Sequence, residues 1–334
     1  MRLSPPWSGR RGAVPFFLIA LGLFSPALLS GQGAARDALP TFPADTRQIL
    51  YSNLAQLRAL PDYSRLRPWI ITQQLSSFEG ILRAFRADPE KEIDEVVLGW
   101  RGEAGSSVSF GLAEGQFHPD ATHDYFVQHQ ISYQQYQGYE LYGFGSSTEP
   151  DALFFAFFDS STAIFGRLSD LKALLDVRAG VKPALQSNAS FVSAEGELEG
   201  SAALWGIVQG DLASSEALPV LTGGAKTPGD PKELLAPIRM VIYRLDWDGQ
   251  FTMHMSLLCR DAESAAKLSQ ALALFRAARP TPTAKSTSAS SAGVMALLQG
   301  MDSQTNGSRI DLSGSVSSAL AEQVLRNGVS LIAP

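Results

Sequence analysis

The sequence predicts an α+β protein in which mainly antiparallel sheets pack against helices, in two related halves that each contain a ββα unit. Three observations predict this fold. Two pairs of strand-sized segments, 96–101 with 108–117 and 240–247 with 251–258, have the pattern of β-hairpins. A segment with apolar residues at helical spacing follows each pair. Asp248-Gly249, between the second pair, is the strongest short signal of a hairpin turn.

The chain begins with the pattern of a secretory signal at residues 1–35. Three arginines and no acid precede the end of an apolar run from Ala13 to Leu29, and small residues follow the run. A positive segment, an apolar segment and a small-residue cleavage site in that order are typical of secretory signals. The adjacent Arg10 and Arg11 invite a twin-arginine interpretation, but the flanking residues do not support it, and a Sec-type signal is expected.

Two cleavage positions satisfy the small-residue rule, after Gly33 and after Ala35. The alternative is an uncleaved anchor in the inner membrane. A spanning helix needs roughly 20 apolar residues, and the run is shorter and interrupted by prolines, so cleavage is preferred. No cysteine lies directly after the run, where it could carry a lipid, and no later apolar segment is long enough to span a membrane. The expected location is the periplasm or the medium.

Composition limits the partners of the protein. The full chain has a net charge of −6, and residues 1–35 carry three positive charges, so the remainder carries −9. This excess of negative charge argues against sequence-independent binding of nucleic acid and against electrostatic docking on anionic lipid. A hydrophobic content of 45% excludes wholesale disorder. Cys259 is the only cysteine, so no intramolecular disulfide forms.

The elements expected in the first half, 36–185, follow from periodicity and turn signals. Ser169 is expected to cap the last helix of this half and Gly180 to end it. The elements are, in order, a proline-containing lead-in at 39–46, a strand at 49–57, a helix at 64–85, a charged turn at 88–95, the hairpin 96–101 with 108–117, a helix at 119–130, strands at 139–144, 153–158 and 162–166, and a helix at 169–177.

The second half, 186–334, has a similar rhythm. Asp261 is expected to cap its long helix. The segment 280–292 is rich in Pro, Thr, Ser and Ala, which predicts a mobile loop. The elements are, in order, a strand at 202–208, a polar region with one or two short helices, the hairpin 240–247 with 251–258, a helix at 261–278, the loop at 280–292, a short helix near Met295, a strand at 308–316 and a helix at 319–326.

An internal repeat is expected because the two hairpins lead into helices through similar residues. The first does so through Asp120-Ala121 and the second through Asp261-Ala262. Each ββα unit buries one face of its sheet under its helix. Whether the halves arose by duplication is left open, because a hairpin followed by a helix also arises independently.

No catalytic motif satisfies a spacing check. His118, His123 and His129 are five and six residues apart, whereas ligands on one helix face stand three or four apart. There is no GxSxG motif of a serine hydrolase. His254 alternates with methionines in a predicted strand, and Cys259 ends that strand as a small hydrophobic residue. No catalytic residue is therefore assigned.

The segments that resemble cofactor sites fail in the same way. Gly223 to Thr227 lacks the glycine that a phosphate loop needs directly before Lys226. The acidic stretch 88–95 has Ile93 where a calcium-binding loop needs glycine. Neither a cofactor nor a metal is expected.

The most distinctive feature is a run of tyrosines interleaved with glutamines. Tyr133, Tyr136, Tyr139 and Tyr142 are its members. Tyrosine is enriched at recognition surfaces because its ring is apolar and its hydroxyl is polar. These four residues form the candidate binding surface, and a twisted strand with tyrosines along its solvent edge is the alternative.

The segment Leu39–Leu60 resembles the opening of exported bacterial proteins of unknown function. The likeness is in Pro43-Ala44-Asp45-Thr46 followed by Ile49 to Leu54 and by Leu57. Such proteins have a signal sequence and repeated α/β units, so the resemblance implies a bacterial envelope origin. It implies no activity and no site residues.

The sequence therefore predicts a non-catalytic exported protein that binds another protein or an envelope component. One alternative is a periplasmic hydrolase whose site is assembled only in three dimensions. A pocket that holds a histidine beside a serine and an acid would favour it. The other alternative is a carrier of a small apolar ligand, which needs an enclosed apolar cavity.

Overall fold

The structure is a computed structural model of the chain. It describes residues 33–61, 63–64, 67, 71, 73–85, 87–101, 110–143, 152–198, 200, 202–210, 235–247, 250–277 and 300–317. All of these residues belong to one compact unit.

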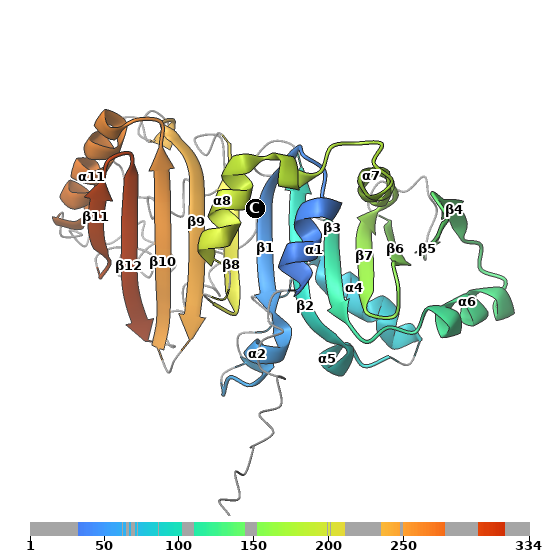
Figure 1. Ribbon diagram of the computed structural model, residues 1–334. Coiled ribbons are helices and arrows are strands. Elements are labelled where there is room, and N and C mark those ends of the chain that lie inside the picture. The colour runs from blue at the N-terminus through green and yellow to red at the C-terminus, as the bar shows by residue number, and fades with distance from the viewer. Residues whose placement is uncertain are drawn as a thin grey trace, which may run out of the picture. The chain divides into compact units, whose positions relative to one another are not determined.

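The described strands form one 12-stranded sheet with the order β11-β12-β10-β9-β8-β1-β2-β3-β7-β6-β5-β4 (Figure 1). Every pairing is antiparallel. The strands are β1 Thr46–Asn53, β2 Ile93–Arg101, β3 Phe110–Gly115, β4 Gln134–Tyr136, β5 Tyr139–Gly143, β6 Leu153–Phe157, β7 Thr162–Arg167, β8 Leu204–Gln209, β9 Ile238–Trp247, β10 Gln250–Cys259, β11 Asp302–Asn306 and β12 Arg309–Ser317. The predicted α+β class with antiparallel pairing is confirmed.

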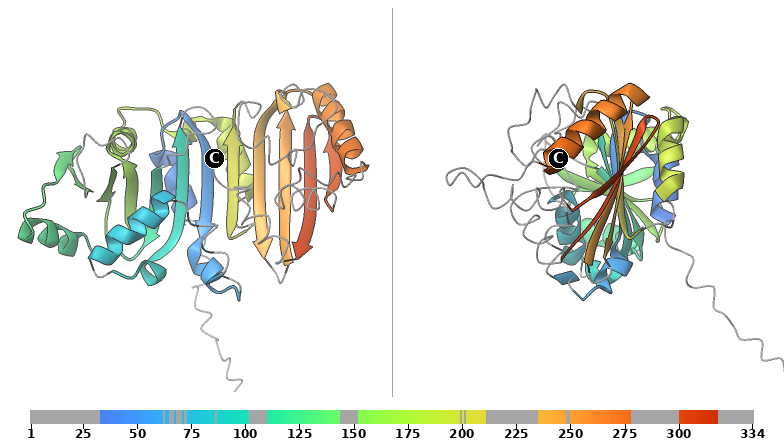
Figure 2. Two further views of the ribbon diagram at one scale, coloured as in Figure 1. Left: turned by 180° about the vertical axis from the view of Figure 1, so that it is seen from behind. Right: turned by 90° about the vertical axis from the view of Figure 1, so that its left-hand side faces the viewer.

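Helices pack on both faces of the sheet. The α1 face carries α1, α7 and α8, and the α4 face carries α2, α4, α6 and α11. Figure 2 shows α8 and α11 on opposite sides of the sheet. The helices are α1 Gly33–Thr41, α2 Leu54–Arg58, α4 Gln73–Ala84, α5 Pro89–Glu92, α6 Pro119–Gln128, α7 Leu168–Arg178, α8 Ala189–Leu198 and α11 Ala262–Ala277, with a short 3-10 helix, η1, at Leu185–Ser187.

The connections repeat on either side of the junction between β1 and β8. In the first half, β2 and β3 lead into α6, and the chain returns so that β7 pairs with β3. In the second half, β9 and β10 lead into α11, and β12 returns to pair with β10. This order fits the predicted ββα units, and the sheet is continuous across both halves. A common origin of the halves stays a prediction.

The strand predicted at 49–57 is wrong in its second part. The strand ends at Asn53, whose side-chain oxygen accepts a hydrogen bond of 2.8 Å from the backbone N–H of Gln56. This is the geometry of a helix cap, and α2 follows. Asp88 likewise accepts from the N–H of Glu90 at 3.2 Å, so helix α5 replaces the charged turn predicted at 88–95.

The lead-in predicted at 39–46 is also wrong in its first residues, because α1 continues to Thr41. Ala34, Ala35 and Ala38 of α1 are almost completely buried in the core of the α1 face. Small side chains let this helix approach the sheet closely. The helix begins at the segment that the sequence assigns to signal cleavage.

The cap predicted at Ser169 is wrong, since α7 already begins at Leu168, and Arg167 precedes it without a side-chain cap. Gly180 does end α7, with a φ of 74° that favours glycine. Besides α1, α2 and α5, three further elements were not predicted: α8, β4 and β11. The predicted loop at 280–292 and the helices near Met295 and at 319–326 lie outside the described residues.

Candidate functional site

The α1 face is not covered by any described helix over β10, β12 and β11. Helices α1, α7 and α8 cover this face from β7 to β8. Helix α11 contacts β10, β11 and β12, but it does so on the opposite side, where Ala265 and Leu268 pack with Met253. Figure 1 shows these three strands in front of α11 and beyond the edge of α8.

The strand registers bring a set of polar side chains together on this uncovered face. His254 pairs with Arg244 on one side and with Ser313 on the other, and Ser256 pairs with Asp311. Directly opposite residues on neighbouring strands point to the same face. We call this set the polar patch; it consists of Arg244, Asp246, Thr252, His254, Ser256, Asp302, Gln304, Arg309, Asp311, Ser313 and Ser315.

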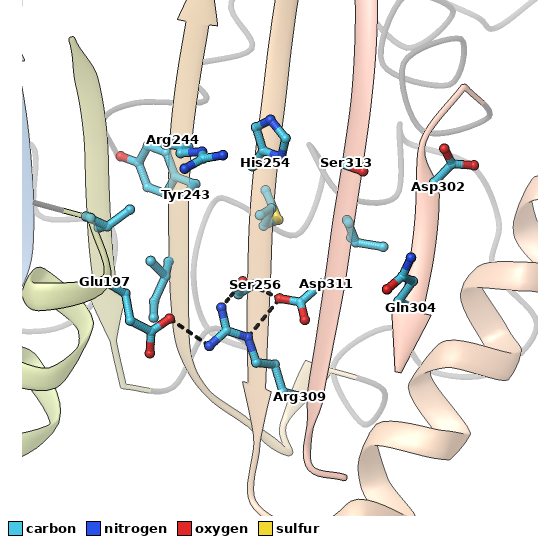
Figure 3. Close-up of a pocket in the computed structure, with 14 residues that line it drawn as sticks. Glu197, Tyr243, Arg244, His254, Ser256, Asp302, Gln304, Arg309, Asp311 and Ser313 are labelled. Carbon is cyan, nitrogen blue, oxygen red and sulfur yellow. Dashed lines mark hydrogen bonds and ion pairs between the residues drawn. The ribbon is translucent and has the colours of Figure 1, made fainter. Parts of the chain in front are cut away.

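Arg309 is the centre of the hydrogen bonds in the polar patch (Figure 3). Its guanidinium donates to Asp311 Oδ1 at 2.8 Å, to Glu197 Oε2 of α8 at 2.7 Å and to Ser256 Oγ at 2.8 Å. Ser256 in turn donates to Asp311 Oδ1 at 2.5 Å. One cation therefore links α8 to strands β10 and β12.

These hydrogen bonds favour the charged forms of Asp311 and Arg309. Burial opposes the ionisation of Asp311, but the hydrogen bonds from Ser256 and Arg309 outweigh it and lower the pKa of the carboxyl. Burial also opposes the charge of Arg309, and the bonds to Asp311 and Glu197 outweigh it and raise the pKa of the guanidinium. Asp311 is therefore a carboxylate at neutral pH and a weak base.

A second group of charges lies beside the first. Asp246 Oδ2 is 3.7 Å from Arg244 Nε and 3.8 Å from His254 Nε2. Arg244 Nε is buried and has no hydrogen bond among the described residues. About a third of the Arg244 side chain is nevertheless exposed (36%). Arg244 can therefore offer guanidinium donors to an acceptor from outside the chain.

A pocket of about 340 Å³ lies over the polar patch. Its lining includes Glu197, Arg244, His254, Ser256 and Arg309. These groups carry both signs of charge and need hydrogen-bond partners when water is displaced. The pocket is thus suited to a polar occupant.

The structure places the four predicted tyrosines on both faces of the sheet edge formed by β4 and β5. Tyr142 is buried on the α4 face, and its hydroxyl donates to Glu140; the Tyr133 ring packs 5.6 Å from the Tyr142 ring. Tyr136 lies on the α1 face and donates to Asp176 at 2.6 Å, while Tyr139 accepts from Arg178 at 2.9 Å.

All four tyrosines are thus partly or fully buried in contacts within the chain. The structure does not bring them together on one surface. Binding at this edge stays a prediction, and the polar patch is the larger assembly of polar groups.

His123 and His129 of the first half contact separate partners. His123 Nδ1 is 3.0 Å from Glu140 Oε2, and His129 Nδ1 is 2.8 Å from the carbonyl oxygen of Tyr125. Among the described residues, no group of three or more His, Cys, Asp or Glu side chains is placed to hold a metal. Cys259 is buried, which raises the pKa of its thiol. None of the described helices is both long and apolar enough to cross a bilayer.

Sequence reasoning missed the polar patch, although one signal was visible. In β10, His254 and Ser256 alternate with Met253, Met255 and Leu257, so one face of this strand is polar. The partners of these residues lie on β9, β12 and α8, and only the registers bring them together. Strand β11 and helix α8 were not predicted at all.

No family model matches this chain, and no curated protein matches it either. The chain is similar to a solved structure, one crystal form of TP0453, at 12% identity with a TM-score of 0.49, covering 87% of this chain and 97% of that chain. A second crystal form of TP0453 gives a TM-score of 0.47 at the same identity, covering 87% of this chain and 96% of that chain.

Proposed function

We propose that the protein is an exported, non-catalytic binding protein and that a partner protein docks on the polar patch. The observation that carries the proposal is the polar face of β10, β12 and β11, which none of the described helices covers, beside a part of the same face that α1, α7 and α8 cover. Partly exposed hydrogen-bonding groups of both charges support a partner with a matching polar surface, because such groups orient a complex.

The chemistry of the partner follows from the groups that are available. Arg244 offers donors to a carboxylate, and Asp246 and Asp302 offer acceptors to a cation or an amide. The net charge of −6 argues against a nucleic acid. A small apolar ligand would remove water from the charged groups that line the pocket, at a cost of about 1–3 kcal/mol for each polar group left unpaired.

Photo-crosslinking from two exposed positions tests this proposal. A photoreactive residue at Ser315 of β12 is expected to capture one discrete partner from the envelope of the source organism. The same residue at Lys267, on the solvent side of α11, is the matched control and is expected to capture none. Arg244→Glu is expected to weaken capture from position 315 while the melting temperature stays near that of the wild type. Equal capture from both positions would contradict docking on this face.

A hydrolase is the second candidate, because the pocket contains His254, Ser256 and Asp311. Catalysis by a serine needs a base that accepts its proton. Here the Ser256 hydroxyl donates to Asp311, and no hydrogen bond joins it to His254 among the described residues. The geometry therefore supports binding better than acyl transfer.

Turnover assays separate the two candidates. The purified protein is expected to hydrolyse none of a panel of esters, peptides and glycosides. Hydrolysis that disappears in both Ser256→Ala and His254→Ala would establish the enzyme and overturn the binding proposal.

A further inference from the structure

Two glutamates lie beneath the first turn of α1. Glu95 of β2 and Glu114 of β3 are directly opposite each other, and Asn53 of β1 is opposite Glu95 on its other side. Glu95 is almost fully buried (4% exposed). Two carboxylates on directly opposite residues oppose each other's ionisation unless a cation or several hydrogen-bond donors compensate.

The backbone nitrogen of Ala34 is the group that these carboxylates face. It donates to Glu95 Oε2 at 3.2 Å, and Glu114 also receives a hydrogen bond from the Ala34 backbone. Asn53 Nδ2 donates to Glu95 Oε1 at 3.3 Å. Two acids therefore converge on a single N–H at the start of a helix.

Gly33 lies beside the Glu114 carboxylate. A Cβ atom on Gly33 would collide with the Glu114 carboxylate, so a larger residue at this position would force the Glu114 side chain to move. Ala34 and Ala35 are 0% and 2% exposed, so the core includes them. A chain cut after Ala35 would lose both residues and the N–H that the acids bind.

We propose that hydrolysis of the Gly33–Ala34 bond during export leaves Ala34 as the amino-terminal residue, with its α-ammonium group held between the carboxylates of Glu95 and Glu114. Water adds across the peptide bond, catalysed by an export peptidase. Gly33 leaves as a carboxylate with the signal, and the Ala34 nitrogen becomes the ammonium. The proposal rests on the export part of the proposed function and not on partner docking.

The ammonium places a positive charge directly between the two carboxylates. With Ala34 as an amide, burial first and Glu95 second raise the pKa of Glu114 to about 7, and Asp37 and Asp159 add to the effect. A cation between the two carboxylates favours their ionised forms. The alternative is an uncut chain, in which the acids face the helix dipole and the Ala34 N–H in place of an ammonium group.

The first test is the mass of the exported protein. The full chain, expressed in a bacterium and recovered from outside the cytoplasm, is expected to begin at Ala34 by intact mass and by sequencing of its amino-terminal peptide. A start at Arg36, at Met1 or at any other residue would overturn the proposal. Partner capture plays no part in this measurement, so docking can fail without affecting it.

The second test is the pKa of the new amine, taken from the pH dependence of its acetylation rate. An ordinary α-amino group titrates near ~7.7–8.0. The Ala34 amine is expected to titrate above that range, and to return to it or below in Glu95→Gln/Glu114→Gln.

The control Glu263→Gln removes an exposed acid of α11 and is expected to change nothing. An ordinary pKa in the wild type would show that the acids do not hold the ammonium and would overturn the proposal. If the double variant does not fold, Glu114→Gln alone is compared, and it too is expected to lower the pKa.

Discussion

Arg309 links three elements at the surface through one side chain. Its guanidinium contacts Asp311 and Ser256 on the sheet and Glu197 on α8. About a third of the side chain is exposed (35%), so solvent screens each pair. A network around one planar guanidinium is worth more than isolated surface pairs because its geometry is fixed by several acceptors.

We expect Arg309→Ala to lower the free energy of unfolding by about 0.5–1 kcal/mol, measured by urea denaturation. Arg309→Lys keeps the charge but loses the fork of donors, so its free energy of unfolding is expected to lie between those of the wild type and of Arg309→Ala. Lys267→Ala removes an exposed helix pair and serves as the control. A loss for Lys267→Ala equal to that for Arg309→Ala would mean that the network adds nothing.

Asp261 shows how a single side chain begins a helix. Its carboxylate accepts from the backbone N–H of Ser264 at 2.7 Å. This bond, then the Ser264 hydroxyl and Arg260, lower the pKa of Asp261 to about 2. The sequence predicted this cap correctly, because Asp before an apolar helical pattern is a local signal.

We expect Asp261→Ala to lower the urea midpoint at pH 7, and Asp261→Asn, which can still cap, to lower it less. The folded pKa lies below the ordinary value of 3.8, so the ionised cap stabilises fully above that pH and its contribution is lost as the pH falls through 2. The difference in urea midpoint between the wild type and Asp261→Asn should therefore become smaller as the pH falls from 4 to 2. A gap that is constant with pH would contradict the role of the charge.

Among the elements, the prediction succeeded where periodicity was strong. Strands β9 and β10 and helix α11 follow from alternation, an Asp-Gly turn and a capped helical pattern. Helix α1 was missed because its core contacts are made by Ala34, Ala35 and Ala38, which also fit the small residues of a cleavage site. The polar patch was missed because it depends on registers between strands that are distant in sequence.

Helix α4 contains a glycine that the fold does not require. Gly80 lies in the middle of α4, and nothing lies within 4 Å of the place where a Cβ atom would stand. We expect Gly80→Ala to stabilise the protein by about 0.5–1 kcal/mol, because glycine loses more backbone entropy in a helix than alanine does. Thermal denaturation measures the gain.

Gly115 is the contrasting position. A Cβ atom there would overlap the backbone carbonyl of Glu92, which already accepts from the N–H of Gln116 at 2.7 Å. Gly115→Ala is therefore expected to destabilise the fold by at least ~1–3 kcal/mol. Equal effects at Gly80 and Gly115 would mean that local space does not decide the outcome.

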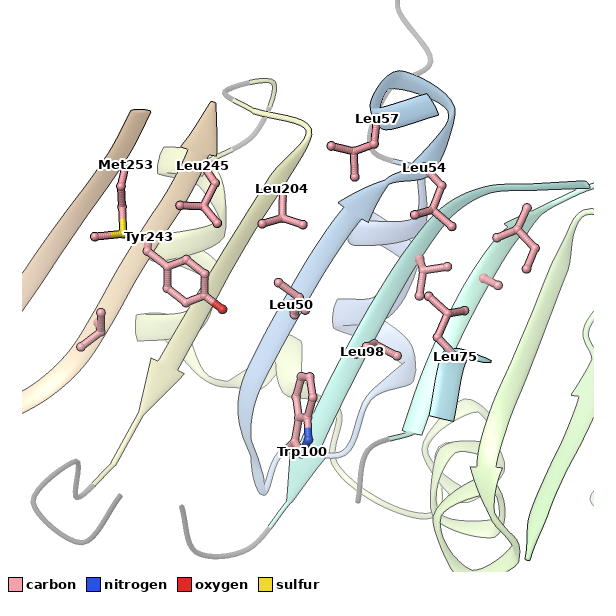
Figure 4. Packing of buried hydrophobic residues seen from close by; sticks show 14 of the residues in the cluster. Leu50, Leu54, Leu57, Leu75, Leu98, Trp100, Leu204, Tyr243, Leu245 and Met253 are labelled. Carbon is pink, nitrogen blue, oxygen red and sulfur yellow. The ribbon is translucent and has the colours of Figure 1, made fainter. Parts of the chain in front are cut away.

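For the whole molecule, the core crosses the junction between the halves. Figure 4 shows Leu50 and Leu98 of β1 and β2 on the same face as Tyr243, Leu245 and Met253 of β9 and β10. All of them belong to one cluster of buried side chains. Contacts that extend across a boundary couple the stability of its two sides.

We expect one cooperative unfolding transition. Tryptophan fluorescence of a variant with Trp7→Phe, Trp69→Phe and Trp247→Phe, which keeps only Trp100 and Trp205 near the junction, should give the same midpoint as far-UV circular dichroism, which reports on the entire sheet. Two separated midpoints would show that the halves unfold independently.

The pairing of β1 with β8 has a kinetic consequence. Ile49 pairs with Ile207, so the centre of the sheet closes only after roughly 150 intervening residues have left the ribosome, and contacts of such long range form slowly. A nascent chain with this topology keeps its central strand incompletely paired for most of its synthesis. Delayed closure of this kind prolongs the unfolded state, which the proposed export through a Sec-type channel would require.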